Sequence, residues 1–281
     1  VIKIPRTSLL EDKKFSRRFA RELKSLGELS HSSIVEIQAM GNHHGIPFAV
    51  MQYLAGGDLE DQRPVDKTGQ VLPYDPNRLG HWLARICEAL DFIHQKGYVH
   101  RDIKPSNILF DTAGRPYISD FGVVKAITEA SGEASAESLT DTDHVLGTVA
   151  YLAPEMLSPD EISGQSDQYS LAVTIYELLA GQLPFAESTS TLESLEHLTQ
   201  PVPPLRDINA TISPELATAL HKALEQDPHQ RYPSCRAFGK ALLATVADAD
   251  EITSTARAEI RAAPTTAHLN CPTCQVQLKI T

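Results

Sequence analysis

The sequence lacks the features of a membrane-spanning or secreted protein. It contains no run of about 18 apolar residues, the length that a helix needs to cross a bilayer. Its N-terminus also lacks the charged segment followed by an apolar one that marks a secretory signal. We therefore expect these residues to be cytoplasmic. Whether the full-length protein carries a membrane anchor outside them is left open.

Positive charge and cysteine are both scarce. The 36 acidic residues outnumber the 25 Lys and Arg and give a net charge of -11. This balance argues against a general nucleic-acid or anionic-membrane binder, because phosphate backbones are bound by basic surfaces. Of the four cysteines, Cys87 and Cys235 lie alone in expected helices, where a buried reduced thiol is the usual state. Such usage is typical of a reducing compartment rather than a disulfide scaffold.

The apolar residues are arranged as in a folded α+β protein. The 281 residues suffice for one large domain or two smaller ones, and they show no internal repeat. Apolar side chains at helical spacing and short apolar runs between turn residues predict the elements. The expected helices are residues 14–30, 79–95, 167–180, 214–225 and 235–247, and the expected strands are 1–5, 34–40 and 47–54, with a turn at 41–45.

One stretch concentrates polar residues of chemical interest. Residues 98–122 read YVHRDIKPSNILFDTAGRPYISDFG. Two polar blocks, one containing Asp102 and Asn107 and the other Asp120, are separated by apolar segments of strand character. A single Asp or Asn in such a place is usually a turn or cap residue. Their combination favours a catalytic role.

Three motifs occur in order: HRDIKPSN at 100–107, DFG at 120–122 and APE at 153–155. Together they resemble the signature of protein kinases, more narrowly the bacterial eukaryotic-like (Hanks-type) serine/threonine kinases. Any one of them arises by chance, but all three together do not. The resemblance runs from residue 1 to about residue 246. It implies an α+β, two-lobed kinase fold: residues 1–54 as a partial N-lobe (an incomplete β-sheet plus one helix) and 55–247 as a larger, mainly helical C-lobe.

The resemblance also implies the reaction, Mg²⁺-assisted transfer of the ATP γ-phosphate to Ser or Thr hydroxyls of proteins, with Mn²⁺ as an alternative ion. Asp102 would orient the substrate hydroxyl, and Lys104 would contact the γ-phosphate. Asn107 and Asp120 would hold the metal through oxygen atoms. Thr148 matches the threonine that helps to select a hydroxyl substrate.

The same resemblance assigns the ATP-binding residues. Lys3, in a shortened form of the strand motif, would contact the α- and β-phosphates and pair with Glu22 of the first helix. Such a pair, closing only when the helix swings inward, is a conformational switch. Met51 resembles the gatekeeper behind the adenine, and Gln52 and Leu54 belong to the hinge, which binds adenine through its backbone.

Regulation is expected in the segment after the DFG motif, where the composition of residues 128–143 predicts a mobile loop. Arg101, next to Asp102, marks kinases whose activation loop is phosphorylated, because arginine pairs with phosphate. Thr140 and Thr142 resemble paired autophosphorylation sites, which would involve self-association. The alternative is that they are two of many Ser and Thr residues in a disordered segment.

Three further residues match structural positions of the family. Asp167 matches an aspartate of a buried helix that holds the catalytic-loop backbone. Arg231 matches the arginine that pairs with the glutamate of the APE motif, Glu155. Loss of Asp167 or of Arg231 should lower stability more than it alters chemistry.

Both ends of the chain depart from the family pattern. The chain begins at Val1 and contains no glycine-rich phosphate loop, so we expect a truncated fragment that itself has little activity. Residues 248–267 are interpreted as a linker, and 268–281 as the start of a zinc-ribbon-like segment with Cys271 and Cys274. Two cysteines supply half of the usual ligands, so we do not expect zinc in this chain.

A pseudokinase or ATP-binding scaffold without transfer activity is the alternative function. The presence of Lys3, Asp102, Asn107 and Asp120 together favours the active kinase over it. A small-molecule kinase of related fold is disfavoured by Thr148 and the APE motif. The expected partners are protein substrates, not nucleic acid.

Overall fold

The computed structural model divides the chain into two compact units, Val1–Val246 and Ala247–Thr281. It describes residues 1–4, 27, 29–44, 46–120, 149–157, 161–185, 198, 200–246, 267–270 and 277–280. The smaller unit contains an antiparallel hairpin of β6 (Ala267–Asn270) and β7 (Gln277–Ile280). Within the described ranges, no helix is both long and apolar enough to cross a membrane.

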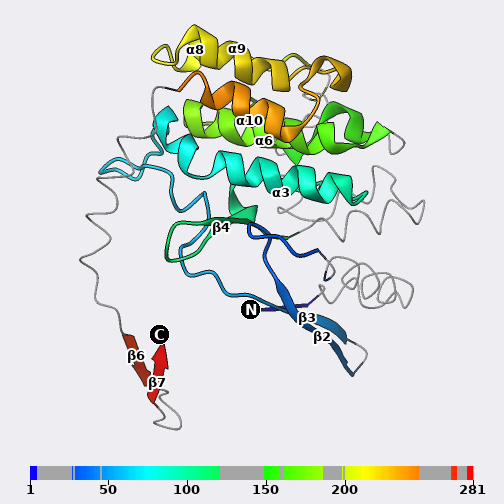
Figure 1. The fold of residues 1–281 in the computed structure, drawn as a ribbon. Coiled ribbons are helices and arrows are strands. Elements are labelled where there is room, and N and C mark those ends of the chain that lie inside the picture. The colour runs from blue at the N-terminus through cyan, green and yellow to red at the C-terminus, as the bar shows by residue number, and fades with distance from the viewer. Residues whose placement is uncertain are drawn as a thin grey trace. The chain divides into compact units, whose positions relative to one another are not determined.

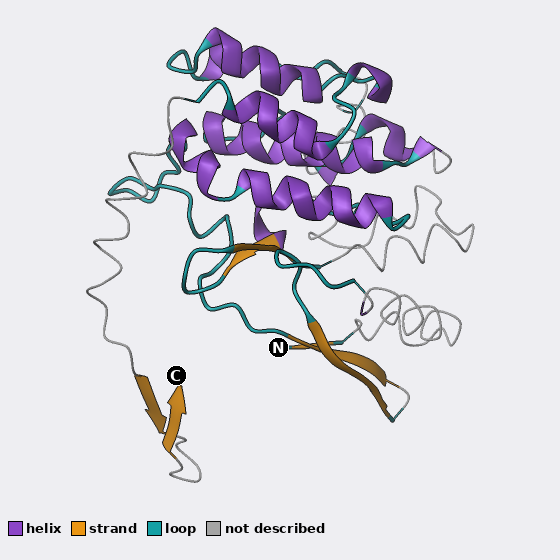
Figure 2. Ribbon diagram, in the orientation of Figure 1, coloured by secondary structure: helices purple, strands orange, loops and turns teal. Residues whose placement is uncertain are grey.

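The larger unit separates strands from helices (Figures 1 and 2). A three-stranded sheet has the order β1-β3-β2, and a short hairpin β4-β5 lies between it and the helices. The strands are β1 (Ile2–Lys3), β2 (Ile37–His43), β3 (Ile46–Met51), β4 (Ile108–Phe110) and β5 (Pro116–Ile118). The α-helices are α3 (Leu83–Gln95), α6 (Gly164–Ala180), α8 (Leu205–Ile208), α9 (Pro214–Ala223) and α10 (Cys235–Leu243), and the 3-10 turns are η1 (Pro76–His81), η2 (Pro105–Asn107), η4 (Pro154–Leu157) and η6 (Pro228–Gln230).

Helix α6 is the centre of the helical part. Every residue from Ser166 to Ala180 is buried, which confirms the prediction of a helix in the middle of a domain. Ser163 caps its N-terminus in a capping box with Ser166, and Gly181 ends it in a left-handed conformation (φ 79°). The helix begins at Gly164, three residues before the predicted start. The prediction missed these residues because they are polar and carry no apolar periodicity, and only the serine cap marks them.

The predicted start of the first helix in the helical part is wrong. The apolar spacing predicts residues 79–95, whereas the structure has η1 (Pro76–His81) followed by α3 from Leu83. Trp82, with φ -134° and ψ -33°, separates the two, and its N–H bonds to the carbonyl of Leu79. The end is as predicted, because Gly97 adopts φ 81° and its N–H bonds to the carbonyl of His94.

The hairpin of β2 and β3 also differs from the prediction. Its strands pair through residues 41–43, which the sequence predicts as part of the turn. The chain reverses at His44, which has φ 51°. Pairing continues this far because Gly41 leaves room for the ring of Phe48, whose Cζ would lie 2.4 Å from a Cβ at that position.

The other predictions differ by smaller amounts or lie outside the described residues. Helices α9 and α10 end two and four residues earlier than predicted. The expected helix at 14–30 and the linker fall almost wholly outside the described ranges. Cys87 and Cys235 are buried free thiols, as predicted.

Candidate active site

The β4-β5 hairpin brings the two polar blocks of the sequence together. Its register pairs Ile108 with Ile118. Asn107 precedes β4 and Ser119 follows β5, and the N–H of Ser119 donates to the carbonyl of Asn107 at 2.9 Å. Asp120 is the next residue, so residues 13 positions apart meet at one end of the hairpin.

Asp102 is held by groups of its own loop. The Nδ2 of Asn107 donates to the Asp102 carbonyl at 2.6 Å and to its Oδ2 at 2.9 Å. The Nζ of Lys104 lies 3.4 Å from the same Oδ2. The carboxylate therefore lies between a cation and an amide donor, with its side chain 17% exposed.

Asn107 and Asp120 present suitable oxygen atoms for a hard cation. Both contacts of the Asn107 amide to Asp102 use its nitrogen, which turns the amide oxygen away from that aspartate. Asp120 contributes a carboxylate that is 44% exposed on its side chain. Oxygen ligands of these two types fit Mg²⁺.

Lys3 of β1 reaches Asp120 from the sheet. Its Nζ forms an ion pair and hydrogen bond with Asp120 Oδ1. The lysine side chain is 38% exposed. Glu22, its predicted partner, lies outside the described residues, so that pair stays a prediction.

The expected hinge follows β3. The half-buried Met51 ends the strand, and Leu54 is buried against Val35 and Tyr117. The N–H of Gln52 donates to the carbonyl of Glu36 at 3.0 Å. This N–H is therefore engaged within the protein, and adenine recognition would fall to other backbone groups of the hinge.

The backbone takes an unusual conformation at two site positions. Arg101 has φ 66° and Asp120 has φ 55°, which is the left-handed region that residues with a side chain seldom occupy. Such conformations persist where surrounding contacts enforce them. These two conformations set the positions of Asp102 and of the Asp120 carboxylate. No pattern in the sequence predicts them.

Asp167 of α6 provides the enforcing contacts on one side. Its carboxylate accepts from the backbone N–H of His100 and of Arg101, each at 2.8 Å, and from Nε2 of His94 at 2.7 Å. Burial alone would raise the pKa of Asp167, but the hydrogen bond and charge of His94, with the hydrogen bond from the backbone N–H of His100, outweigh it and lower the pKa. The family resemblance predicts the backbone contact of Asp167 but not its contact with His94.

His100 links the catalytic loop to the β4-β5 hairpin. Its Nε2 donates to the carbonyl of Ser119 at 2.8 Å, and its Nδ1 accepts from the N–H of Asp102 at 3.3 Å. Burial lowers the pKa of His100, although Asp167 acts in the opposite direction. The neutral ring therefore fits both contacts.

Glu155 and Arg231 form the ion pair that the family resemblance predicts. Nη1 and Nη2 of Arg231 donate to the two carboxylate oxygens of Glu155 at 2.7 and 2.8 Å. Ser166 Oγ donates to the same carboxylate at 2.8 Å, and the Arg231 guanidinium lies over the ring of Tyr169. Both charged side chains are essentially inaccessible.

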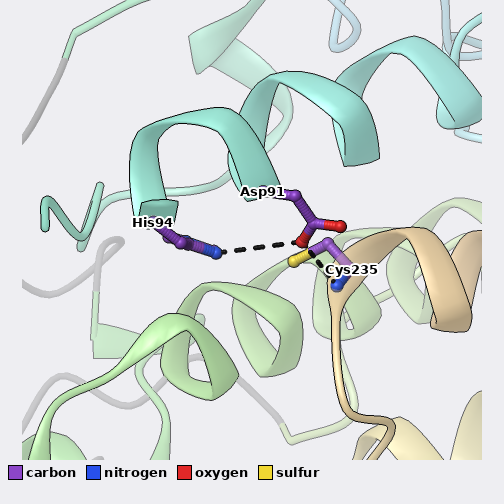
Figure 3. Close-up of side chains that lie close together, drawn as sticks. All are labelled: Asp91, His94 and Cys235. Carbon is purple, nitrogen blue, oxygen red and sulfur yellow. Dashed lines mark hydrogen bonds and ion pairs between the residues drawn. The ribbon is translucent and has the colours of Figure 1, made fainter. Parts of the chain in front are cut away.

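Asp91, His94 and Cys235 lie close together (Figure 3), and His94 also contacts Asp167. Their potential ligand atoms lie within 4.8 Å of one another. Asp91 accepts from the N–H groups of Cys235 and Arg236, at 2.9 and 3.1 Å, and so caps α10. Burial raises the pKa of Cys235 well above its usual range. These contacts join α3 to α10, and the bond from His94 to Asp167 joins α3 to α6. The packing of the three helices therefore accounts for the cluster.

Several predicted site residues lie outside the described residues. They are Glu22, Thr140, Thr142 and Thr148. Their assigned roles remain predictions.

Comparison with known proteins shows the family to which this arrangement belongs. The model of the protein kinase domain matches residues 1–242. The chain belongs to the protein kinase family. Serine/threonine-protein kinase PknB of Mycolicibacterium smegmatis is 34% identical over 236 residues, which cover 82% of this chain and 36% of PknB. Serine/threonine-protein kinase PrkC of Bacillus subtilis is 34% identical over 251 residues, or 89% of this chain and 37% of PrkC.

The fold of the kinase domain agrees with solved structures. The Mycobacterium tuberculosis PknI kinase domain matches it with a TM-score of 0.61 at 28% identity, covering 87% of this chain and 84% of that one. This confirms the predicted two-lobed α+β fold, with the β1-β3-β2 sheet as N-lobe and the helical part as C-lobe. The chain spans little more than a third of the length of PknB and PrkC.

Proposed function

We propose that this chain is the catalytic domain of a bacterial serine/threonine protein kinase that transfers the γ-phosphate of ATP to protein hydroxyls. The observation that carries the proposal is the meeting of Asp102, Lys104, Asn107 and Asp120 at the end of one hairpin, with Lys3 reaching it from the sheet. Phosphoryl transfer needs positioning and charge neutralisation more than covalent chemistry, and these residue types supply both.

Each residue has a role in this proposal. Asp102 orients the attacking hydroxyl and accepts its proton, while Lys104 offsets negative charge at the transferred group. Asn107 and Asp120 hold Mg²⁺ through their side-chain oxygens, and the ion neutralises charge on the phosphates. Lys3 binds the phosphates from the sheet side. Phosphorylation of Thr140 and Thr142 would provide an anion for Arg101.

Phosphate transfer by the full-length protein tests the proposal. With Mg²⁺ and ATP, mass spectrometry should find phosphate on Ser or Thr of casein. Asp102→Asn should lower the rate by about a hundredfold or more, the usual range for a lost general base. Asp207→Asn, the same chemical change at an exposed position of α8, is the matched control and should keep the rate.

The result also separates the alternatives. A protein that binds Mg-ATP but transfers nothing would be the scaffold rather than the kinase. Phosphate confined to a small-molecule acceptor would likewise contradict the proposal. Absence of phosphate from both Thr140 and Thr142 in an active preparation would exclude the proposed activation by autophosphorylation while leaving the kinase intact.

A further inference from the structure

Three side chains with metal-binding atoms lie together where α3 meets α10 (Figure 3). Asp91 and His94 are one turn apart on α3, and Cys235 is the first residue of α10. Their potential ligand atoms all lie within 4.8 Å of one another, and Nδ1 of His94 is 4.0 Å from Oδ1 of Asp91. The helix contacts that bring these residues together use Nε2 of His94 and backbone N–H groups of α10. Those contacts involve neither Nδ1 of His94 nor Sγ of Cys235.

The chemical types of the three atoms indicate one class of ion. Carboxylate oxygen, imidazole nitrogen and thiolate sulfur are all ligands of Zn²⁺, whereas Mg²⁺ and Ca²⁺ prefer oxygen alone. Zinc bonds of about 2.0–2.3 Å in a tetrahedral site place the ligand atoms about 3.3–3.8 Å apart. Side-chain rotations that shorten the largest separation by about 1 Å would therefore bring the three atoms to one ion.

The surroundings of His94 favour a metal on Nδ1. The Nε2 of the same ring lies 2.7 Å from Oδ2 of Asp167. Histidine ligands of zinc usually donate the proton of their other ring nitrogen to a carboxylate, which fixes the tautomer and orients the ring. Gly164 leaves the other side of the ring uncrowded, because a Cβ at that position would lie 2.6 Å from Nδ1. The second nitrogen thus has the partner that a zinc-binding histidine needs.

The burial of the cluster leaves one position for a water molecule. Cys235 is 1% exposed and the Asp91 side chain 9%, whereas the His94 side chain is 17% exposed. Water would therefore enter beside His94 and complete the four ligands that zinc takes. On binding, the thiol of Cys235 would lose its proton to solvent, because zinc binds the thiolate.

We propose that Asp91, His94 and Cys235 bind a zinc ion, with water as the fourth ligand. The ion would join α3 to α10 directly and would reach α6 through the bond from His94 to Asp167. This site is separate from the cysteines of 271–274, and it revises the expectation, drawn from those two cysteines, that the chain holds no zinc. It is also separate from the residues assigned to Mg²⁺ and does not depend on the proposed kinase function.

Co²⁺ is the probe, because it replaces zinc in tetrahedral sites and its bond to a thiolate gives a charge-transfer absorption band. The parent protein for the test is the full-length protein with Cys271→Ser and Cys274→Ser, so that these two thiols cannot bind the ion. Titration with Co²⁺ alone, without ATP, should produce the thiolate band. Cys235→Ala should abolish it and weaken Co²⁺ binding by about a hundredfold or more, since loss of an outer-shell partner alone costs 10–100-fold. This change keeps the backbone N–H that bonds to Asp91.

Cys87→Ala is the matched control. Cys87 is also a buried free thiol on α3, but its Sγ lies against Gly239, one turn further along α10. This variant should keep both the band and the affinity for Co²⁺. His94→Gln, whose amide can still donate to Asp167, should weaken Co²⁺ binding as Cys235→Ala does. Zn²⁺ should raise the melting temperature of the parent protein by a few degrees and leave that of Cys235→Ala unchanged.

The absence of a thiolate band at saturating Co²⁺ would contradict the proposal. A band that survives Cys235→Ala would do the same, because another thiol would then be the ligand, as would a band that Cys87→Ala abolishes equally. If Cys235→Ala does not fold, weakened Co²⁺ binding by folded His94→Gln supports the site, and unchanged binding contradicts it. All of these measurements are made without phosphate transfer, so a failure of the kinase function would leave their outcome unaffected.

Discussion

Two regions supply the residues of the proposed active site, and they hold them differently. The C-lobe fixes the catalytic loop and the APE motif with Asp167, Glu155 and Arg231, all of them at most 5% exposed. The N-lobe contributes Lys3 from an edge strand, and its ion pair with Asp120 is about 40% exposed on each side chain. Buried, multiply bonded groups keep one geometry, whereas an exposed single contact can be exchanged for another. The comparison indicates a rigid catalytic loop. It also indicates that Lys3 could exchange its ion pair with Asp120 for a contact with a phosphate.

The largest effect should come from breaking a buried pair in the C-lobe. Arg231→Met leaves the Glu155 carboxylate buried without its cation and should lower the free energy of unfolding by about 3–5 kcal/mol. Urea denaturation measures it. Adding Glu155→Leu removes the unpaired charge and should restore most of the loss. A single variant as stable as the wild type would show that the pair does not anchor the lobe.

Asp167→Asn should have the next largest effect. An amide keeps the shape but can no longer accept all three hydrogen bonds, and one buried donor left unpaired costs about 1–3 kcal/mol. Because the backbone of His100 and Arg101 would loosen, kcat should fall while KM for ATP changes little. Unchanged kcat in a destabilised variant would limit Asp167 to a purely structural role.

The stability of the C-lobe should depend on pH through His100. Its pKa in the folded protein is lowered from 6.5, so the unfolded chain binds more protons below that pH. The contribution of the neutral His100 to stability is therefore complete above about pH 6.5 and is lost as the pH falls. We expect the melting temperature to drop by a few degrees toward pH 5. His100→Gln, which can still donate to Ser119, should flatten this dependence. The exposed His43→Asn is the control and should leave the dependence as it is.

The smallest effect on stability should come from the N-lobe contact. Lys3→Met removes an ion pair that solvent screens, so the free energy of unfolding should change by about 0.5 kcal/mol or less. In the full-length protein KM for ATP should nevertheless rise, because the lysine would bind the phosphates. Lys67→Met, at an exposed loop position, is the matched control. A large loss of stability in Lys3→Met would contradict the proposed difference between the lobes.

Candidate catalytic residues could be named from the sequence more readily than the contacts that hold them. The residues of 100–107 and 120–122 form local motifs, so Asp102, Asn107 and Asp120 could be named before their geometry was known. Asp167, Glu155 and Arg231 could be named through the family resemblance. His94 and the contact of Asp91 with Cys235, 144 positions apart, could not, because single polar residues far apart in the chain leave no pattern.

Element boundaries were missed for a related reason. The start of α3 is set by the η1 turn, whose proline and Asp75 cap lie before the apolar periodicity begins. The extent of the β2-β3 hairpin depends on the fit of Phe48 over Gly41, which only the paired strands reveal. The left-handed backbone of Arg101 and Asp120 is likewise imposed by tertiary contacts.

The crossing between the lobes has a mechanical consequence. Residues just before β2 are bonded to the C-lobe: the N–H of Val35 donates to the Ile118 carbonyl, and the N–H of Ile118 to that of Ser33, both at 2.9 Å. The chain thus passes between the lobes at Glu36 and again at Gln52, and a backbone hydrogen bond joins these two crossings. Because the first crossing is bonded to β5 and the second is bonded to the first, the position of Lys3 over Asp120 depends on the backbone around Glu36 and Gln52, far from both residues in the sequence.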